Sequence, residues 1–292
     1  MNGEYRSKIE QVKIDGENFA KSAMKGVYAE QSAALDELHK IVGKVYIDHA
    51  KNGMLSLTAV EKSSIAEEAT NHLKDMGFEL STSEVEKVGS ILGNVFKDTY
   101  YKNIYTLESG MPINLKFNIL KKEYVDAAVN AKYKGELFSE RIWTNKADMI
   151  DSLKLSITNA MKGNTTIDDI GKQISERFNV TAYESQRLVM NEVARCQSQA
   201  TDDMATATGV DQQMYSATLD GLTSSECAND DGKVWGIDDE DKVVPPENHV
   251  GCRCCLINVP YDGWSPTGRK DNETKEIIAY TNFEDWAADK GI

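Results

Sequence analysis

The fold is decided by the stretch from Thr181 to Pro260, which ends in the run Pro245-Pro246-Glu247-Asn248-His249-Val250-Gly251-Cys252-Arg253-Cys254-Cys255 and a short apolar segment. The five cysteines of the chain and the only histidine of its second half lie between Cys196 and Cys255. Helical patterns precede this stretch, and short alternating apolar runs, typical of strands, lie within it. The stretch therefore holds both the change from helix to sheet and the side chains with the most specific chemistry.

Composition and charge bound the class of protein. The 292 residues are 40% hydrophobic, which is enough to fill the cores of two ordinary domains. A net charge of -14 argues against nonspecific binding of nucleic acid over a broad surface, but it does not exclude a local basic patch. No segment reaches the apolar length that spans a bilayer, and Met1-Asn2-Gly3-Glu4-Tyr5 lacks the pattern of a targeting sequence. The cysteines are clustered and odd in number, which favours reduced thiols in a cytoplasm, with metal binding as the exception.

Residues 1 to about 130 are predicted to be helical. One apolar face, which ends at the Asn52-Gly53 turn, consists of Leu35, Leu38, Ile41, Val42 and Val45. A second helix is predicted over Thr58–Gly77, and a third begins with a cap in the Ser81-Thr82-Ser83 cluster. Gly110-Met111-Pro112 breaks the pattern, and residues 117–129 form one further short helix.

Helices continue past a predicted boundary at Lys134-Gly135. Asn145 caps one that closes at Gly163-Asn164, and its apolar face at four-residue spacing consists of Met149, Leu153, Ile157 and Met161. Thr166 caps the next helix, whose buried face consists of Ile170, Ile174 and Phe178. The capping box Thr181-Ala182-Tyr183-Glu184 opens a further helix that Gly209 ends.

Three short strands are predicted behind these helices, at Gln213–Leu219, Lys233–Trp235 and Cys252–Val259. Helices followed by a few short strands indicate a mostly helical α+β protein. The predicted domains are a helical N-terminal domain (1–134), a helical domain with a small antiparallel sheet (135–262) and a C-terminal tail with a short helix (263–292).

The second half of the chain resembles the phage Mu protein F-like family of minor head, or head morphogenesis, proteins of tailed bacteriophages. The resemblance covers about residues 135–290 and rests on the order of several motifs. They are Ser139-Glu140-Arg141-Ile142-Trp143, the helix with Arg187, Glu192 and Arg195, Thr218-Leu219-Asp220 with Thr223-Ser224-Ser225-Glu226-Cys227, Asp231-Gly232-Lys233-Val234-Trp235, and the ending from Pro245-Pro246 to Cys252-Arg253. Tyr280-Thr281-Asn282-Phe283-Glu284-Asp285-Trp286 is similar to a C-terminal helix of family members from phages of Gram-positive bacteria.

This resemblance implies a minor capsid protein that is packaged inside the phage head and is present in the host cytoplasm during assembly. The implied partners are the portal protein or the major capsid protein, with packaged DNA as a further one and no membrane. The implied role is head morphogenesis, or DNA packaging or ejection. The acidic composition agrees with it, because like charge opposes nonspecific adhesion to DNA.

Four side chains of the cysteine-rich stretch could hold one metal ion: Cys227, His249, Cys252 and Cys254. Thiolate and imidazole ligands suit tetrahedral zinc, and such a site would clamp the loops of a small sheet. Cys255 follows Cys254 in a predicted strand, so the two point to opposite faces and do not both bind one ion. In the alternative interpretation, Cys227 and Cys252 pack as small buried residues and His249 hydrogen-bonds a loop. The sequence therefore requires no cofactor, and a structural zinc ion is the one that these residues could hold.

The remaining motif residues are interpreted as fold-forming: Arg187, Glu192, Asp220, Asp231, Gly232, Pro246 and Arg253. Arg187 and Glu192 are expected to pair with, or cap, the turns at Asp220 and Asp231. We expect Gly232 at positive φ and the Pro245-Pro246 pair to stiffen the last loop. Cys196 lies in an apolar helical row, where a cysteine packs as a small hydrophobic residue.

The alternative function is an enzyme carried in the virion, either a nuclease or an ADP-ribosyltransferase-like effector. Related head domains are fused to such modules, whereas only about 30 residues follow Pro260 here, too few to bury a core of their own. No nucleophile, base and orienting group are spaced so as to require a catalytic role, so no catalytic residue is assigned and no enzymatic activity is expected. A third alternative, nucleic-acid binding through Lys121-Lys122 and Lys132 to Lys134, rests on few charges.

Overall fold

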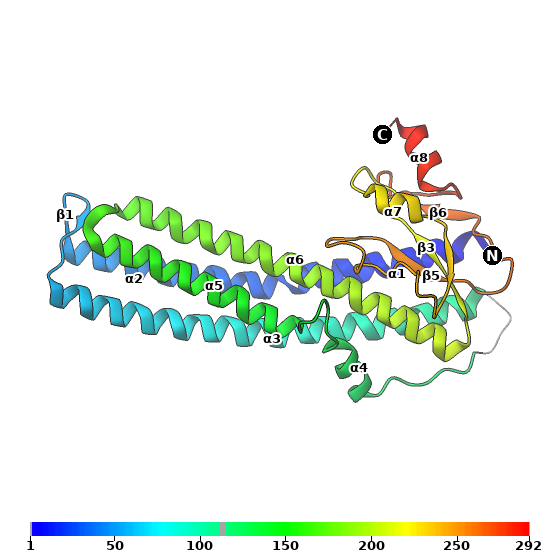
Figure 1. Cartoon of the computed structure of the whole chain (residues 1–292), viewed down its shortest axis with the longest axis horizontal. Helices are drawn as coiled ribbons and strands as arrows, with labels where there is room; N and C mark the ends of the chain where they lie inside the picture. The colour runs from blue at the N-terminus through cyan, green and yellow to red at the C-terminus, as the bar shows by residue number, and fades with distance from the viewer. Residues whose placement is uncertain (1, 111–114, 292) are drawn as a thin grey trace. The chain divides into compact units, whose positions relative to one another are not determined.

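The computed structural model describes residues 2–110 and 115–291 (Figure 1). The protein is mostly helical with small antiparallel sheets, which confirms the predicted α+β class. The helices are α1 (Asn2–Ala23), α2 (Lys25–His49), α3 (Ala59–Gly110), α4 (Lys122–Val129), α5 (Phe138–Asn159), α6 (Ile167–Thr208), α7 (Ser225–Asp230) and α8 (Phe283–Lys290), with a π-helical turn (Ala160–Asn164) after α5. The strands are β1 (Ala50–Lys51), β2 (Met54–Leu55), β3 (Gln212–Ser216), β4 (Val234–Gly236), β5 (Cys255–Asn258), β6 (Gly268–Lys270) and β7 (Ile277–Ala279).

The chain forms two compact units, each built from segments that are not consecutive in the sequence. Residues 1–21, 90–133 and 189–292 form one, called here the mixed unit, and residues 22–89 and 134–188 form the other, called the helical unit. The division of the chain into 1–134, 135–262 and 263–292 stays a prediction, because these units are grouped by contact and not by sequence order. Within the described ranges, no helix has both the length and the apolar character that crossing a bilayer requires.

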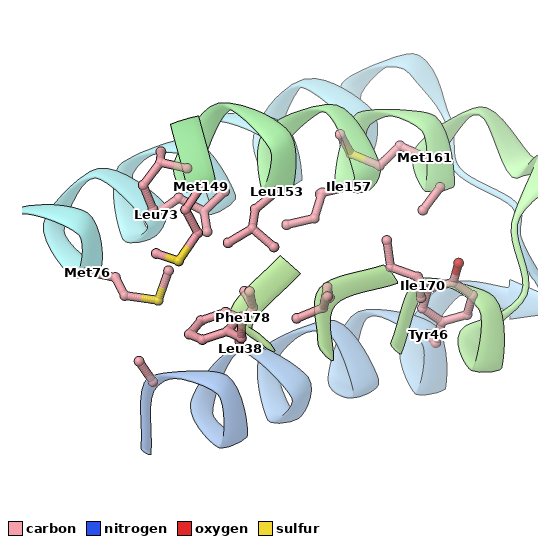
Figure 2. Packing of buried hydrophobic residues seen from close by; sticks show 14 of the residues in the cluster. Leu38, Tyr46, Leu73, Met76, Met149, Leu153, Ile157, Met161, Ile170 and Phe178 are labelled. Atoms are coloured by element: carbon pink, nitrogen blue, oxygen red, sulfur yellow. The ribbon is translucent and has the colours of Figure 1, made fainter. Parts of the chain in front are cut away.

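Four helical segments enclose the core of the helical unit: α2, the first part of α3, α5 and the first part of α6 (Figure 2). The side chains of Leu153, Ile157 and Ile170 point into this core, together with Leu38 from α2 and Leu73 from α3. The apolar faces predicted for α5 and for the start of α6 are thus buried, as their spacing indicated.

The turns and caps at the ends of this core follow local sequence signals. Asn52 and Gly53 have φ angles of 54° and 80° and form the turn between β1 and β2. The hydroxyl of Thr58 accepts the backbone N–H of Glu61 at 3.3 Å, and that of Thr166 accepts the N–H of Asp169 at 3.2 Å. Both predicted threonine caps are therefore confirmed.

Three other predicted helix starts are wrong, because each lies inside a continuous helix. The Ser81 hydroxyl donates to the carbonyl of Gly77 at 2.7 Å within α3, and the Thr181 hydroxyl donates to the carbonyl of Arg177 at 3.0 Å within α6. Asn145 lies inside α5, which begins at Phe138. Serine and threonine hydroxyls can bond the carbonyl four residues earlier, so the same residues serve a helix interior as well as a cap.

Two predicted elements near the middle of the chain differ in extent from the structure. The short helix expected over 117–129 is α4, which begins only at Lys122. Of the predicted break at Gly110-Met111-Pro112, Gly110 is the last residue of α3, and the two residues after it lie outside the described ranges.

A buried ion pair crosses the helical unit. The Lys146 ammonium of α5 lies 2.5 Å from the Glu84 carboxylate of α3, and both side chains are 2% exposed. The same carboxylate accepts the Gln31 amide of α2 at 3.2 Å, and the Ser185 hydroxyl of α6 accepts from Lys146 at 3.3 Å. One polar cluster therefore joins all four helices, and every charge in it has a partner.

The mixed unit contains an antiparallel sheet with the strand order β4-β3-β5. Gln213 of β3 is opposite Trp235 on one side and Asn258 on the other. The three predicted strands are present, two of them shorter: β3 ends at Ser216, and β5 begins at Cys255, since the residues from Cys252 to Cys254 are not paired as a strand. The strand predicted over Lys233–Trp235 is β4, shifted by one residue.

A hairpin of β6 and β7 carries the last helix of the mixed unit. The Asp271 carboxylate accepts the indole N–H of Trp286 at 3.1 Å and lies 3.2 Å from the Lys290 ammonium, both in α8. Burial raises the pKa of Asp271, but hydrogen bonds from Trp286 and from the backbone N–H groups of Thr274 and Glu273 outweigh it and hold this pKa at about 2. The charged form of Asp271 therefore helps to hold α8 in place.

Candidate metal centre

The thiol cluster of the mixed unit is assembled from α7 and from the loop before β5. Cys227 lies in the first turn of α7, where the Ser224 hydroxyl accepts its backbone N–H at 3.3 Å. The Asn191 side chain of α6 accepts the N–H of Gly251 at 2.8 Å and so fixes the loop that carries Cys252. Tyr215 of β3, the strand that pairs with β5, packs against the cysteines of the cluster.

The structure brings the three predicted cysteine ligands together and places the fourth predicted ligand, His249, beside Cys227. The sulfur atoms of Cys227, Cys252 and Cys254 lie within 4.8 Å of one another, and all three residues are buried. The Cys227 and Cys252 sulfurs are 3.7 Å apart, and the His249 Nε2 atom lies 3.0 Å from the Cys227 sulfur. Sulfur ligands about 2.3 Å from a tetrahedral zinc ion stand about 3.8 Å apart, so the thiol spacing fits zinc.

Several donors point at the Cys227 sulfur. The Tyr215 hydroxyl donates to it at 3.1 Å and the Asn248 amide at 3.3 Å. Hydrogen bonds, of which the one from the Cys252 thiol has the largest effect, lower the pKa of Cys227. The hydrogen bonds to Cys227 in turn raise the pKa values of Cys252 and Cys254. Burial lowers the pKa of His249, but its hydrogen bonds to Cys227 and to the Val250 carbonyl outweigh this and raise it. Cys227 is therefore the first thiol of the cluster to ionise.

The two other cysteines lie away from the cluster. Cys196 is fully buried in α6, and burial raises the pKa of its thiol to about 12, which confirms the prediction of a small packed residue. Burial also raises the pKa of Cys255 to about 12, and its strand position opposite Ser216 turns it from the side occupied by Cys254. Neither thiol has the environment of a nucleophile.

A second buried cluster surrounds Asp231. Its carboxylate lies 2.6 Å from Arg269 and 3.4 Å from Arg6, and these three side chains are at most 1% exposed. It also accepts the backbone N–H groups of Ala217 at 2.9 Å and Phe283 at 2.8 Å. Asp231 was predicted to be fold-forming, but its two arginine partners were missed, since nothing in the sequence near Arg6 or Arg269 signals a partner so far along the chain.

Other motif residues also form contacts that hold the fold. Asp220 binds both Nη atoms of Arg253, and the Pro246 carbonyl accepts the Tyr133 hydroxyl at 3.0 Å. Gly232 has a φ of 82°, as expected, and a Cβ atom there would lie 3.1 Å from the Tyr280 hydroxyl.

Arg187 and Glu192 both contact side chains of their own helix, and their expected pairing with the turns at Asp220 and Asp231 stays a prediction. Glu192 is buried and pairs with Arg195 of the same helix at 2.8 Å, while the exposed Arg187 guanidinium lies 6.0 Å from the centre of the Tyr183 ring. Glu192 and Arg195 are three positions apart in one helix and therefore face one another. Asp220 and Asp231 pair with Arg253 and Arg269 from other segments.

Residues 151–257 match the family described as Phage Mu protein F like protein. The chain is 28% identical over 268 residues to a protein of Enterococcus faecalis named NAD(+)--arginine ADP-ribosyltransferase EFV, a match that covers 85% of this chain but only 53% of that protein. It is 22% identical over 278 residues to the Minor head protein GP7 of Bacillus phage SPP1, with 89% of this chain and 90% of that protein covered. No solved structure gives a significant match.

Proposed function

This chain belongs to the phage Mu protein F-like family, and from that premise we propose that it is a minor head protein of a tailed bacteriophage. The observation that carries the proposal is the extent of the match to GP7, which covers nine-tenths of both proteins (89% and 90%). The match to the transferase leaves about half of that protein uncovered. In this proposal the protein is packaged in the head, contacts the portal or the inner shell, and acts in head assembly or in packaging or ejection of DNA.

Co-sedimentation tests this function. The full chain is mixed with portal rings or with procapsids from the same source, and finished particles are examined by mass spectrometry. We expect portal-dependent pelleting and retention of the chain in finished particles. Absence from particles together with no pelleting on either assembly would overturn the proposal.

An enzymatic function is the second candidate, because a relative named as an ADP-ribosyltransferase matches 85% of this chain. We propose that the chain itself does not transfer ADP-ribose. In support of this, the buried carboxylates of Asp231 and Glu84 are each paired with basic side chains of the same cluster, as expected of groups that stabilise the fold. Incubation of the full chain with labelled NAD⁺ and an arginine-rich acceptor should leave the acceptor unlabelled, and labelling above that of a boiled sample would contradict this.

We further propose that Cys227, His249, Cys252 and Cys254 hold a structural zinc ion. The support is the chemistry of this donor set: three buried sulfurs within 4.8 Å of one another, of which the Cys227 and Cys252 pair is 3.7 Å apart, with an imidazole nitrogen beside the first. Asn248 and Tyr215 would donate hydrogen bonds to the Cys227 thiolate. Metal ligands usually have such hydrogen-bonding partners around them. Four protein ligands leave no open position for a substrate, so the ion would stabilise the loops around the sheet.

Metal analysis of the purified full chain tests the zinc proposal. Protein prepared without chelator should contain about one zinc ion per chain, and Cys254→Ser should remove most of it. Cys255→Ser is the matched control, because it makes the same change at the next residue on the opposite face and should leave the zinc content unchanged. Wild-type protein without stoichiometric metal, or equal loss in both variants, would contradict the proposal. Cobalt substitution provides a second readout through its thiolate absorption bands.

A further inference from the structure

A cleft of about 490 Å³ lies in the mixed unit between α1 and the strands β3 and β6. Its walls come from four segments: α1, the end of β3, the loop before β5, and the β6–β7 hairpin. Its cationic side chains are Lys13, Lys21, Arg253, Lys270 and Lys275, and its carboxylates are Glu10, Glu17 and Asp220. The cleft therefore carries an excess of positive charge in a chain whose net charge is -14.

The three carboxylates of this cleft are already engaged. Glu10 lies 3.0 Å from Arg6, which is outside the lining, and accepts the Ser216 hydroxyl at 2.7 Å and the Lys270 backbone N–H at 2.8 Å. Asp220 binds Arg253, and Glu17 pairs with Lys13. None of the carboxylates is therefore available to neutralise another cation.

Within the described part of the chain, the other three lysines of this cleft have no carboxylate partner. The Lys270 ammonium donates to the neutral Gln11 amide oxygen at 2.7 Å, and the Lys275 ammonium donates to the backbone carbonyl of Asn272. Neither these two nor Lys21 lies within ion-pair distance of any carboxylate in residues 2–110 and 115–291. Uncompensated lysines from two segments, α1 and the β6–β7 hairpin, around one cavity are an electrostatic arrangement that attracts a multiply charged anion.

We propose that this cleft binds the phosphate groups of a nucleotide, either free or within a single strand. The three lysines supply the positive charge that phosphate oxygens require. The volume is in the range of small-ligand pockets, which is enough for a nucleotide but not for a duplex. This inference does not depend on the proposed role in the phage head.

Isothermal titration of the full chain with inorganic pyrophosphate at low salt tests the inference. We expect one site per chain, with an affinity that falls as salt is added. The double variant Lys270→Gln and Lys275→Asn should weaken binding at least tenfold. Asparagine suits the second position because Lys275 has a φ of 67°, a conformation that asparagine adopts readily.

The double variant Lys8→Gln and Lys102→Gln is the matched control. Both lysines are exposed in the mixed unit, lie outside the cleft and pair with acids of their own helices, and the change in net charge is the same. Its affinity for pyrophosphate should stay within twofold of the wild type. No heat of binding at millimolar pyrophosphate, or equal weakening in both double variants, would overturn the inference.

Competition then separates the two sources of phosphate. Displacement of pyrophosphate by ADP but not by a short single-stranded oligonucleotide would assign the cleft to a free nucleotide, and the reverse would assign it to a strand. Failure of both to displace pyrophosphate would show an adventitious anion site only and would overturn the proposal.

Discussion

Replacement of Asp231 by alanine is expected to lower the free energy of unfolding by about 3–5 kcal/mol, because it leaves the buried Arg269 guanidinium without its counter-ion and leaves Arg6 with Glu10 alone. Arg6 and Arg269 are both fully buried, and each loses its contact with this carboxylate. Two backbone N–H groups, those of Ala217 and Phe283, lose their acceptor as well. Urea denaturation followed by circular dichroism would measure the loss.

Asp230→Ala is the matched control for this experiment. Asp230 precedes Asp231 directly, and its carboxylate pairs with the exposed Lys233 at 2.8 Å. An exposed pair of this kind contributes at most about 1 kcal/mol, so the control should unfold close to the wild type. A similarly small effect of Asp231→Ala would contradict the structural role. A stable Asp231→Ala protein that yields non-infectious particles would instead indicate a direct function for this carboxylate.

Replacement of Glu84 by alanine should destabilise the helical unit by a comparable amount, about 3–5 kcal/mol, because the Lys146 ammonium would stay buried without a charge partner. The Gln31 amide would also lose its acceptor on Glu84. Thermal unfolding and amide hydrogen exchange of α5 would report the loss, since the exchange of this helix depends on local stability.

The double variant Glu84→Leu and Lys146→Met distinguishes the cost of an unpaired charge from the contribution of the pair. Two apolar residues of similar size need no counter-ion, so the double variant should be much more stable than Glu84→Ala. Glu30→Ala serves as the surface control, because Glu30 pairs with Lys87 where both side chains are more than one-third exposed (43% and 36%). A double variant as unstable as the single one would show that burial of the pair is not the cause.

The apolar faces of the helices could be predicted because periodicity is a local property of the sequence. The four-residue spacing from Met149 to Met161 gave the buried side of α5 without any knowledge of its neighbours. The starts of helices could not be predicted equally well. Ser81 and Thr181 have the sequence of a cap, but each hydroxyl bonds a carbonyl inside a longer helix, and packing of the flanking turns decides between the two arrangements.

The thiol cluster could be predicted from the sequence, whereas the arginine partners of Asp231 could not. Cys252, Cys254 and His249 lie within a few residues of one another, so their spacing indicated a shared site, and the structure places the predicted fourth ligand, Cys227, beside them. Arg6 is 225 residues from Asp231, and no periodicity or motif relates them. Residue spacing predicts which side chains share a face, but not which distant segment covers that face.

The contacts of α1 also set an order of events during synthesis. Tyr5 donates to the Asn258 carbonyl across 253 residues, and Glu10 accepts from Lys270 across 260 residues. The helical unit, in contrast, is complete once residue 188 has left the ribosome. A nascent chain folds from its N-terminal side as domains emerge, yet here the first helix must wait for almost the last strand. Until then the charged face of α1 that carries Arg6 and Glu10 stays open to water, and premature termination near the C-terminus would deprive the N-terminal helix of its partners.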